Sequence, residues 1–414
     1  MFTLREKTFL VTAITYVTFV LLPIFADFTG INIQMVSVLV VGMLICLYPS
    51  AFLCRRTYWC MGYIMVMLLY YALGNQLTIG IGTMEDGRKL IIESAFILPS
   101  LSILNVLYYL NKGELYSIIF RSSMIVFGLS LLYLVPMTLI NGEILRLRDH
   151  SYIEVTIPGL PSYPLMHSYA MMLVLFIYAF SVTRGRYKVI SSVAFVLMLY
   201  LIFRTYITTS FVIVIALLLF MIIYQKGKLL RTGIVASVFL IVGLFVLKSG
   251  LLYSFLEEIK PVFENTAVEA KIVDVQATVS SGEYTGESIT VRADRHDISM
   301  NSFLENVFVG DVNSALNTNI SGEHSTILDR LAGFGLFGFI PFIMIFITSF
   351  IDVFKLLVTE RARVYYAIAL VVTLIYLYMK GLFGNEGWFT FLVFIPAGMV
   401  YLQYYHEMNV ESED

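Results

Sequence analysis

Charged residues are scarce in this chain of 414 residues, where they make up only 14% of the sequence. Average soluble domains carry about 25%. Hydrophobic residues reach 59% and aromatic residues 15%, so a water-soluble fold would leave much of its surface apolar. Runs of roughly 20 apolar residues, long enough to cross a bilayer core as a helix, recur from end to end. The composition therefore predicts an all-α, polytopic membrane protein.

The sequence also lacks the usual marks of a metal, cofactor or nucleic-acid site. The only three cysteines, Cys46, Cys54 and Cys60, have no metal-ligand spacing and are interpreted as small packing residues. No His, Asp and Glu cluster has ligand spacing, and no glycine-rich phosphate loop is present. The net charge of −2 and the absence of a basic patch give no sign of a nucleic-acid partner. We therefore expect no metal and no cofactor.

Twelve hydrophobic segments are expected to cross the membrane within one polytopic domain, residues 1–414. The first is interpreted as a retained helix and not as a cleaved signal peptide, because no convincing small-residue cleavage site follows it. The segments fall at about 8–26, 32–53, 59–80, 90–110, 116–140, 164–183, 188–203, 207–224, 232–254, 331–353, 364–380 and 388–405.

Lys and Arg alternate between the connections of these segments, which sets the expected orientation. Short cytoplasmic loops retain these residues, so the richer connections are assigned to the inside. With this assignment the alternation holds at every turn, and both termini are expected in the cytoplasm. The inner positions are Arg5, Lys7, Arg55, Arg56, Lys112, Arg184, Arg186, Lys188, Lys226, Lys228, Arg231, Lys355, Arg361 and Arg363.

One junction can be interpreted in two ways. Residues 188–224 are almost continuously apolar, interrupted only by the segment from Arg204 to Ser210. A single long helix would place the next cationic loop outside, whereas a hairpin preserves the alternation, so we predict a hairpin. Its first arm would cover only about 24 Å of a core of about 30 Å, which would leave Arg204 in a recess below the outer surface.

Two outer loops are longer than the other connections. The first, about 141–163, carries Arg146, Arg148 and His150 close together. The second, 255–330, is inserted between the ninth and tenth predicted spans. Its polar first half carries little signal, whereas residues 298–308 alternate at helical spacing and predict a short amphipathic helix on the membrane surface.

Arginines are concentrated in these outer segments, and their chemistry suggests an anionic ligand. Guanidinium is a planar, permanently charged group that binds phosphate with two hydrogen bonds. Each arginine alone could instead pair with a nearby acid, for which Glu143, Asp149, Asp294, Asp297, Glu305 and Asp329 are available. For the set we favour a phosphorylated ligand, bound by Arg146, Arg148, Arg204, Arg292, Arg295 and Arg330.

His324 is the candidate general base. It stands between Glu323 and Ser325, just before a predicted membrane helix. A neutral imidazole with a pKa near 6.5 can accept a proton from an attacking hydroxyl group. The alternative is a surface histidine without a role. His296 is a weaker candidate, and His167 could pack inside its span or line a cavity.

The stretch 289–338 resembles the signature loop of the O-antigen polymerase and O-antigen ligase superfamily. The shared features are Arg292, the amphipathic run S-F-L-E-N-V-F-V-G-D, His324-Ser325 and the glycine-rich helix start L-D-R-L-A-G-F-G-L-F-G. Arg204 occupies the position of an earlier family arginine, without the usual preceding serine. Val307 stands where that family usually has proline, and Asp311 where it usually has a second glycine.

The resemblance implies a GT-C-like, metal-independent, inverting glycosyltransferase in the inner membrane of a bacterium. Its substrate would be a glycan linked to undecaprenyl diphosphate, and its partners would be membrane lipid and a chain-length regulator protein. The active site would face the periplasm or the cell exterior. The resemblance favours a repeat-unit polymerase for O-antigen, capsule or exopolysaccharide over a ligase that transfers glycan to lipid A core. A lipid-linked oligosaccharide flippase or other transporter is the competing class, although such proteins usually carry polar groups near the midplane of their spans.

Overall fold

The chain forms a bundle of helices in the computed structural model, which describes residues 2–77, 96–140, 163–204, 210, 213–214, 217, 251–263, 269, 272–277, 287–311, 325–379 and 384–411. These residues are mostly helical and include no strand, in agreement with the expected all-α class. The elements are α1 (Leu4–Leu21), α2 (Pro23–Thr29), α3 (Ile33–Leu47), η1 (Pro49–Phe52), α4 (Arg55–Leu77), α6 (Ile97–Leu110), α7 (Gly113–Ile140), α9 (Tyr163–Val182), α10 (Gly185–Arg204), α13 (Leu251–Ile259), η2 (Lys260–Phe263), α15 (Glu287–Glu305), α17 (Thr326–Leu356), α18 (Glu360–Met379), α19 (Asn385–Phe389), η3 (Thr390–Phe394) and α20 (Ile395–Glu411).

Six helices in the described part of the chain are long and apolar enough to cross a membrane. A seventh is obtained if α1 and α2 count as one span, bent by 97° where Pro23 follows Leu22. The shorter helices α3 and α6 have 15 and 14 residues. The count of twelve spans stays a prediction, because the segments at 207–224 and 232–254 lie largely outside the described residues.

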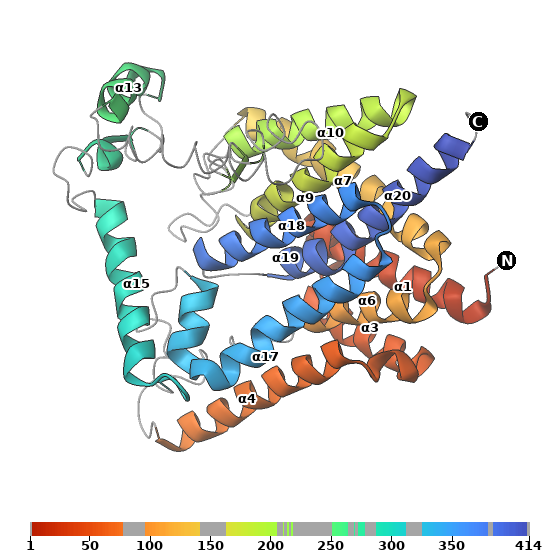
Figure 1. Cartoon of the computed structure of the whole chain (residues 1–414), viewed down its shortest axis with the longest axis horizontal. Coiled ribbons are helices and arrows are strands. Elements are labelled where there is room, and N and C mark those ends of the chain that lie inside the picture. Colours follow the sequence, from red (N-terminus) through yellow and green to blue (C-terminus); the bar gives the residue numbers. More distant parts are fainter. Residues whose placement is uncertain are drawn as a thin grey trace.

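The two ends of the bundle differ in what they carry (Figure 1). Both chain termini lie at one end, which we name the terminal end, and α15 lies at the opposite end, the distal end. Contacts join the predicted inner connections to one another at the terminal end. Lys112 forms an ion pair with Glu6, and the Arg56 Nη1 atom lies 3.5 Å from an Asp352 carboxylate oxygen. The alternating directions of the spans therefore agree with the charge pattern.

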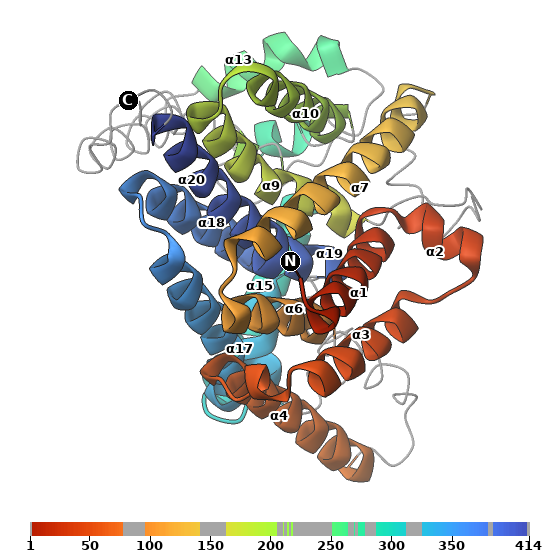
Figure 2. The same ribbon diagram turned by 90° about the vertical axis from the view of Figure 1, so that its right-hand side faces the viewer.

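The interior of the bundle is formed mainly by α9 and the last helical segment. In the apolar windows of these two segments, 83% and 89% of residues are buried, against 22% in α10. The helix α9 packs against α10, α18 and α20 (Figure 2). On the outside, large apolar side chains remain exposed, for example Val38 at 73% and Leu132 at 71%. An apolar exterior of this kind suits contact with lipid.

The helix α17 is divided in two at Gly335, where the backbone leaves the helical conformation with φ 56° and ψ −160°. The segment after α15 fills this break with backbone hydrogen bonds. The amides of Leu336 and Phe337 donate to the carbonyl oxygens of Val307 (2.9 Å) and Phe308 (3.0 Å). In the opposite direction, the Asp311 amide donates to the Ala332 carbonyl (2.8 Å).

This exchange satisfies backbone groups that any interrupted helix leaves without partners. The Tyr70 hydroxyl of α4 adds a further hydrogen bond to the Val309 carbonyl. We name residues 307–311 the docking segment. It attaches the distal helix α15 firmly to two membrane helices, α4 and α17.

Candidate functional site

The helix α15 runs across the distal end, at a steep angle to the helices of the bundle (Figure 1). The sequence predicted a helix over 298–308, and the structure confirms a helix there, which begins earlier at Glu287 and ends at Glu305. One face carries half-buried Arg295 and His296 together with Ser299, which is only 2% exposed. Leu304 lies on the other side of the helix and is 61% exposed, and Met300, one turn after His296, is 40% exposed.

A buried polar contact joins α15 to the start of α17. The Ser299 hydroxyl donates to one carboxylate oxygen of Asp329 (3.0 Å), and the Ser325 amide donates to the other (3.4 Å). Ser325 is the N-cap of α17, because its hydroxyl accepts a hydrogen bond from the Leu328 amide (3.2 Å). Asp329 also lies in the first turn of α17, where the helix dipole favours a negative charge. The start of α17 is therefore fixed against α15.

Two of the predicted ligand arginines lie around this contact. Arg295 is one helical turn before Ser299 on the same face of α15. Arg330 follows Asp329 on α17, and its guanidinium lies 5.8 Å from the centre of the Phe334 ring. Both side chains are half-buried. The backbone of Arg292 belongs to the same helix α15, one turn before Arg295.

The last turns of α18 connect this region with a second polar cluster. The ring of His296 lies 5.7 Å from that of Tyr378, so α15 also reaches α18. Two residues earlier, the Tyr376 hydroxyl donates to the Ser210 hydroxyl (3.0 Å). The Nδ1 atom of His167 lies 3.1 Å from the same Ser210 oxygen. His167 is thus a buried, hydrogen-bonded residue at the distal end of α9.

Arg204 ends α10 at the distal end, and its Nε donates to the carbonyl oxygen of Thr138 on α7 (3.1 Å). The side chain is half-buried, as expected for an arginine in a recess. The predicted cause of this burial, a first arm too short to cross the membrane core, is wrong, because α10 begins at Gly185 and has 20 residues. A helix of that length covers about 30 Å, so it is not too short for the core. Arg204 is shielded instead by its contact with α7.

Several predicted site residues fall outside the described residues. These are His324, Arg146, Arg148 and the side chain of Arg292. The structure therefore places Arg295 on α15 and Arg330 on the start of α17, each near the Ser299–Asp329 contact, and it holds Arg204 at the same end of the bundle. Within the described ranges, no group of three or more His, Cys, Asp or Glu is arranged to hold a metal ion.

Sequence reasoning did not select Ser210, Ser299, Tyr376 or Tyr378 as parts of this region. Ser210 closes the one polar interruption of an apolar stretch, which is a usable signal. Tyr376 and Tyr378 have no such signal in the sequence, because the chain contains 27 tyrosines and only the packing of α18 distinguishes these two. Ser299 is recognisable only once α15 faces Asp329.

The distal end therefore combines cations with a mixed polar and apolar surface next to the apolar exterior of the bundle. Such a surface suits a ligand that has a charged or polar group and a lipid tail. A scan of family models found none that matches this chain, and a search of curated proteins found no match.

Proposed function

We propose that the chain is a membrane glycosyltransferase that polymerises polyprenyl-diphosphate-linked repeat units at the outer face of a bacterial cytoplasmic membrane. One observation carries the proposal: the docking segment and the Ser299–Asp329 contact hold α15 across the distal end with Arg295 and Arg330 beside it. Arginines on helices that are fixed against each other at one membrane face suit a lipid diphosphate. Its metal-independent, GT-C-like character rests on the family resemblance.

In the proposed reaction, a sugar hydroxyl of the acceptor attacks the anomeric carbon of the donor glycan. The new glycosidic bond forms as the bond between this carbon and the diphosphate oxygen breaks, with inversion. His324, which directly precedes the N-cap Ser325, takes the proton of the attacking hydroxyl. Arginines at the distal end stabilise the charge that develops on the leaving polyprenyl diphosphate. Arg292, Arg295 and Arg330 are the proposed diphosphate ligands in this loop, with Arg204 from the bundle and Arg146 and Arg148 from the other outer loop.

Substitution in a strain that lacks the gene tests this proposal. We expect His324→Ala and Arg292→Ala, made separately, to reduce the surface glycan ladder to single repeat units at normal protein level. The matched control is Arg5→Ala, an exposed cation at the terminal end, which should give the wild-type ladder. Wild-type ladders from both distal variants would overturn the catalytic assignment.

The same gel separates the competing functions. Full-length lipid-linked chains that never reach lipid A core would identify a ligase. Undiminished glycan synthesis with failed export of the lipid-linked substrate would identify a flippase. The polymerase is favoured over transport because the arginines proposed as ligands, Arg204, Arg295 and Arg330, lie at one end of the bundle, whereas transport sites usually lie near the midplane.

A further inference from the structure

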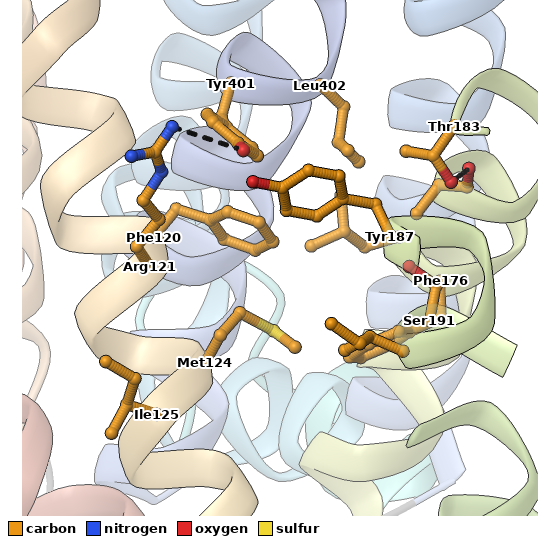
Figure 3. A pocket seen from close by; sticks show the side chains of 13 residues that line it. Phe120, Arg121, Met124, Ile125, Phe176, Thr183, Tyr187, Ser191, Tyr401 and Leu402 are labelled. Carbon is orange, nitrogen blue, oxygen red and sulfur yellow. Dashed lines mark hydrogen bonds between the residues drawn. The ribbon is translucent and has the colours of Figure 1, made fainter. Parts of the chain in front are cut away.

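A pocket opens at the terminal end of the bundle, far along the helices from the region described above. It lies between the first half of α7, the end of α9, the start of α10 and α20, and has a volume of about 230 Å³ (Figure 3). Its walls are mainly apolar, with Phe120, Met124, Leu175 and Phe176 among them. None of the residues that line this pocket belongs to the candidate glycosyltransferase site or to the contacts at the distal end.

The mouth of the pocket carries one cation and two phenols. The Arg121 guanidinium lies 5.1 Å from the centre of the Tyr401 ring and 3.5 Å from its hydroxyl oxygen. The hydroxyl of Tyr187 points toward this pair from the other side of the pocket (Figure 3). Among the residues that the structure describes, no carboxylate forms an ion pair with Arg121. The nearest acidic residue along α7 is Glu114, two helical turns away.

The surroundings of the mouth are strongly cationic. Arg184 lies in the connection between α9 and α10, Arg186 and Lys188 lie in the first turn of α10, and no acidic residue occurs over 181–190. Arg186 lies 5.2 Å from the ring of Tyr187, which itself lines the pocket. From the next connection, Arg361 reaches the Ser181 carbonyl (3.5 Å). A ligand at this mouth gains by carrying negative charge.

The pocket opens sideways, toward the apolar exterior of the bundle. Two of its lining residues, Ile125 and Ile190, are 67% and 54% exposed. Beyond them, Leu129 and Val193 continue the exposed apolar surface at 50% and 53%. Such an entrance faces hydrocarbon chains when α7 crosses a bilayer.

The depth of Arg121 also fits a lipid head group. The helix α7 has 28 residues, which gives about 42 Å of helix against a core of about 30 Å. Arg121 lies eight residues after Gly113, about 12 Å from the start of the helix. If the whole excess of about 12 Å projects at the terminal end, the Arg121 guanidinium lies at the boundary between hydrocarbon and head groups.

We propose that this pocket binds an anionic phospholipid from the leaflet at the terminal end. The phosphate lies against Arg121 and the Tyr187 hydroxyl, and one acyl chain enters between Met124 and Phe176. Arg184, Arg186 and Lys188 select a head group with net negative charge over a zwitterionic one. This site is independent of the proposed glycosyltransferase activity.

Native mass spectrometry of the full-length, delipidated protein tests the proposal. We expect phosphatidylglycerol to bind more tightly than phosphatidylcholine with the same acyl chains. Arg121→Gln should weaken phosphatidylglycerol binding about tenfold, as for the loss of one charge-assisted hydrogen bond, and should weaken phosphatidylcholine binding as well, because both lipids carry the phosphate. Met124→Trp, which fills the pocket with a larger side chain, should weaken the binding of both lipids.

The control is Arg363→Gln, because Arg363 lies at the same end, contacts the Leu357 carbonyl and does not line the pocket. Equal phosphatidylglycerol binding by wild type and both pocket variants would overturn the proposal. So would an equal loss in the Arg363 control, which would indicate a general charge effect. Displacement of phosphatidylglycerol by inorganic phosphate alone would also overturn it. If Arg121→Gln fails to fold, the single variants Tyr187→Phe and Met124→Trp allow the same comparison of lipid binding with wild type.

Discussion

Gly310 and Gly335 hold two backbone segments closer together than any side chain would permit. Both residues have positive φ, 73° and 56°. A Cβ atom on Gly335 would lie 2.6 Å from the Gly310 nitrogen, and one on Gly310 would lie 2.5 Å from the Phe334 nitrogen. Other residues in the left-handed region cost roughly 1–2 kcal/mol before any such clash. The docking segment therefore depends on glycine at both positions.

Gly335→Ala and Gly310→Ala should each destabilise the protein, by ~2 kcal/mol or more. We expect the melting temperature of each variant to fall by several degrees, measured by tryptophan fluorescence of the purified protein in detergent. Gly62→Ala is the matched control, since Gly62 lies inside α4 and an added Cβ would meet no atom within 4 Å. Melting temperatures equal to wild type in both docking variants would contradict the arrangement.

Arg56 and Asp352 form an ion pair at the terminal end in which the two side chains differ in solvent exposure. The arginine side chain is 1% exposed and that of the aspartate is 25% exposed. Arg56 also lies 4.7 Å from the centre of the Tyr108 ring. Removal of Asp352 leaves a buried charge without its counter-ion, whereas removal of Arg56 leaves a carboxylate that water reaches.

Asp352→Asn should therefore lower the free energy of unfolding by roughly 2–4 kcal/mol, more than Arg56→Gln does. The double variant should be more stable than Asp352→Asn alone, because it no longer contains a buried unpaired charge. Thermal unfolding of wild type, the two single variants and the double variant gives the double-mutant cycle. An Arg56→Gln variant less stable than Asp352→Asn would refute this account of the pair.

At the scale of elements, the helix α15 has one side packed against the bundle and another side that exposes apolar residues. Its inner face contacts α17 and α18 through Ser299 and His296, while Leu304 is 61% exposed. Phe308 in the docking segment is 74% exposed. Exposed apolar residues beside a membrane bundle suit insertion into the interfacial region of the bilayer.

Spin labels can measure this insertion in lipid nanodiscs, in a background with the three native cysteines replaced. A label at Leu304→Cys or Phe308→Cys should be more accessible to oxygen than to a water-soluble nickel chelate. A label at Asp294→Cys, an exposed position on the same helix, should show the reverse. Equal nickel accessibility at the three positions would place α15 in water.

Element boundaries were largely predictable from hydrophobic runs, and the break in α17 was not. The run 331–353 predicts the membrane part of α17, which extends from Thr326 to Leu356. The glycines near its start predict a glycine-rich helix beginning, but the interruption at Gly335 exists because residues 307–311 supply its hydrogen bonds. Partners so distant in sequence leave no periodic signal.

For the whole molecule, the charge pattern predicts which helix ends lie together. Contacts between Glu6 and Lys112, and between Arg56 and Asp352, agree with it at the terminal end. The individual partners at the distal end were not predictable, since the contacts of His296 with Tyr378 and of His167 with Ser210 follow from packing of α18 and α9. The expected orientation in the cell stays a prediction.

Cysteine labelling in right-side-out vesicles tests that orientation. Asp294→Cys on α15 should react with a membrane-impermeant maleimide, because the distal end is expected outside. Glu360→Cys, exposed at the start of α18 at the terminal end, should react only after the vesicles are permeabilised. The opposite pattern would invert the molecule and place the distal arginines in the cytoplasm, away from the proposed substrate.

The central claim is that the distal end joins glycan repeat units, and reconstitution tests it most directly. The purified protein in nanodiscs would receive lipid-linked glycan extracted from a strain that lacks the gene, and product length would be read on a gel. The account predicts a ladder from wild type and from Arg5→Ala, and single repeat units from His324→Ala. A ladder of wild-type length from His324→Ala, at equal protein level, would contradict it.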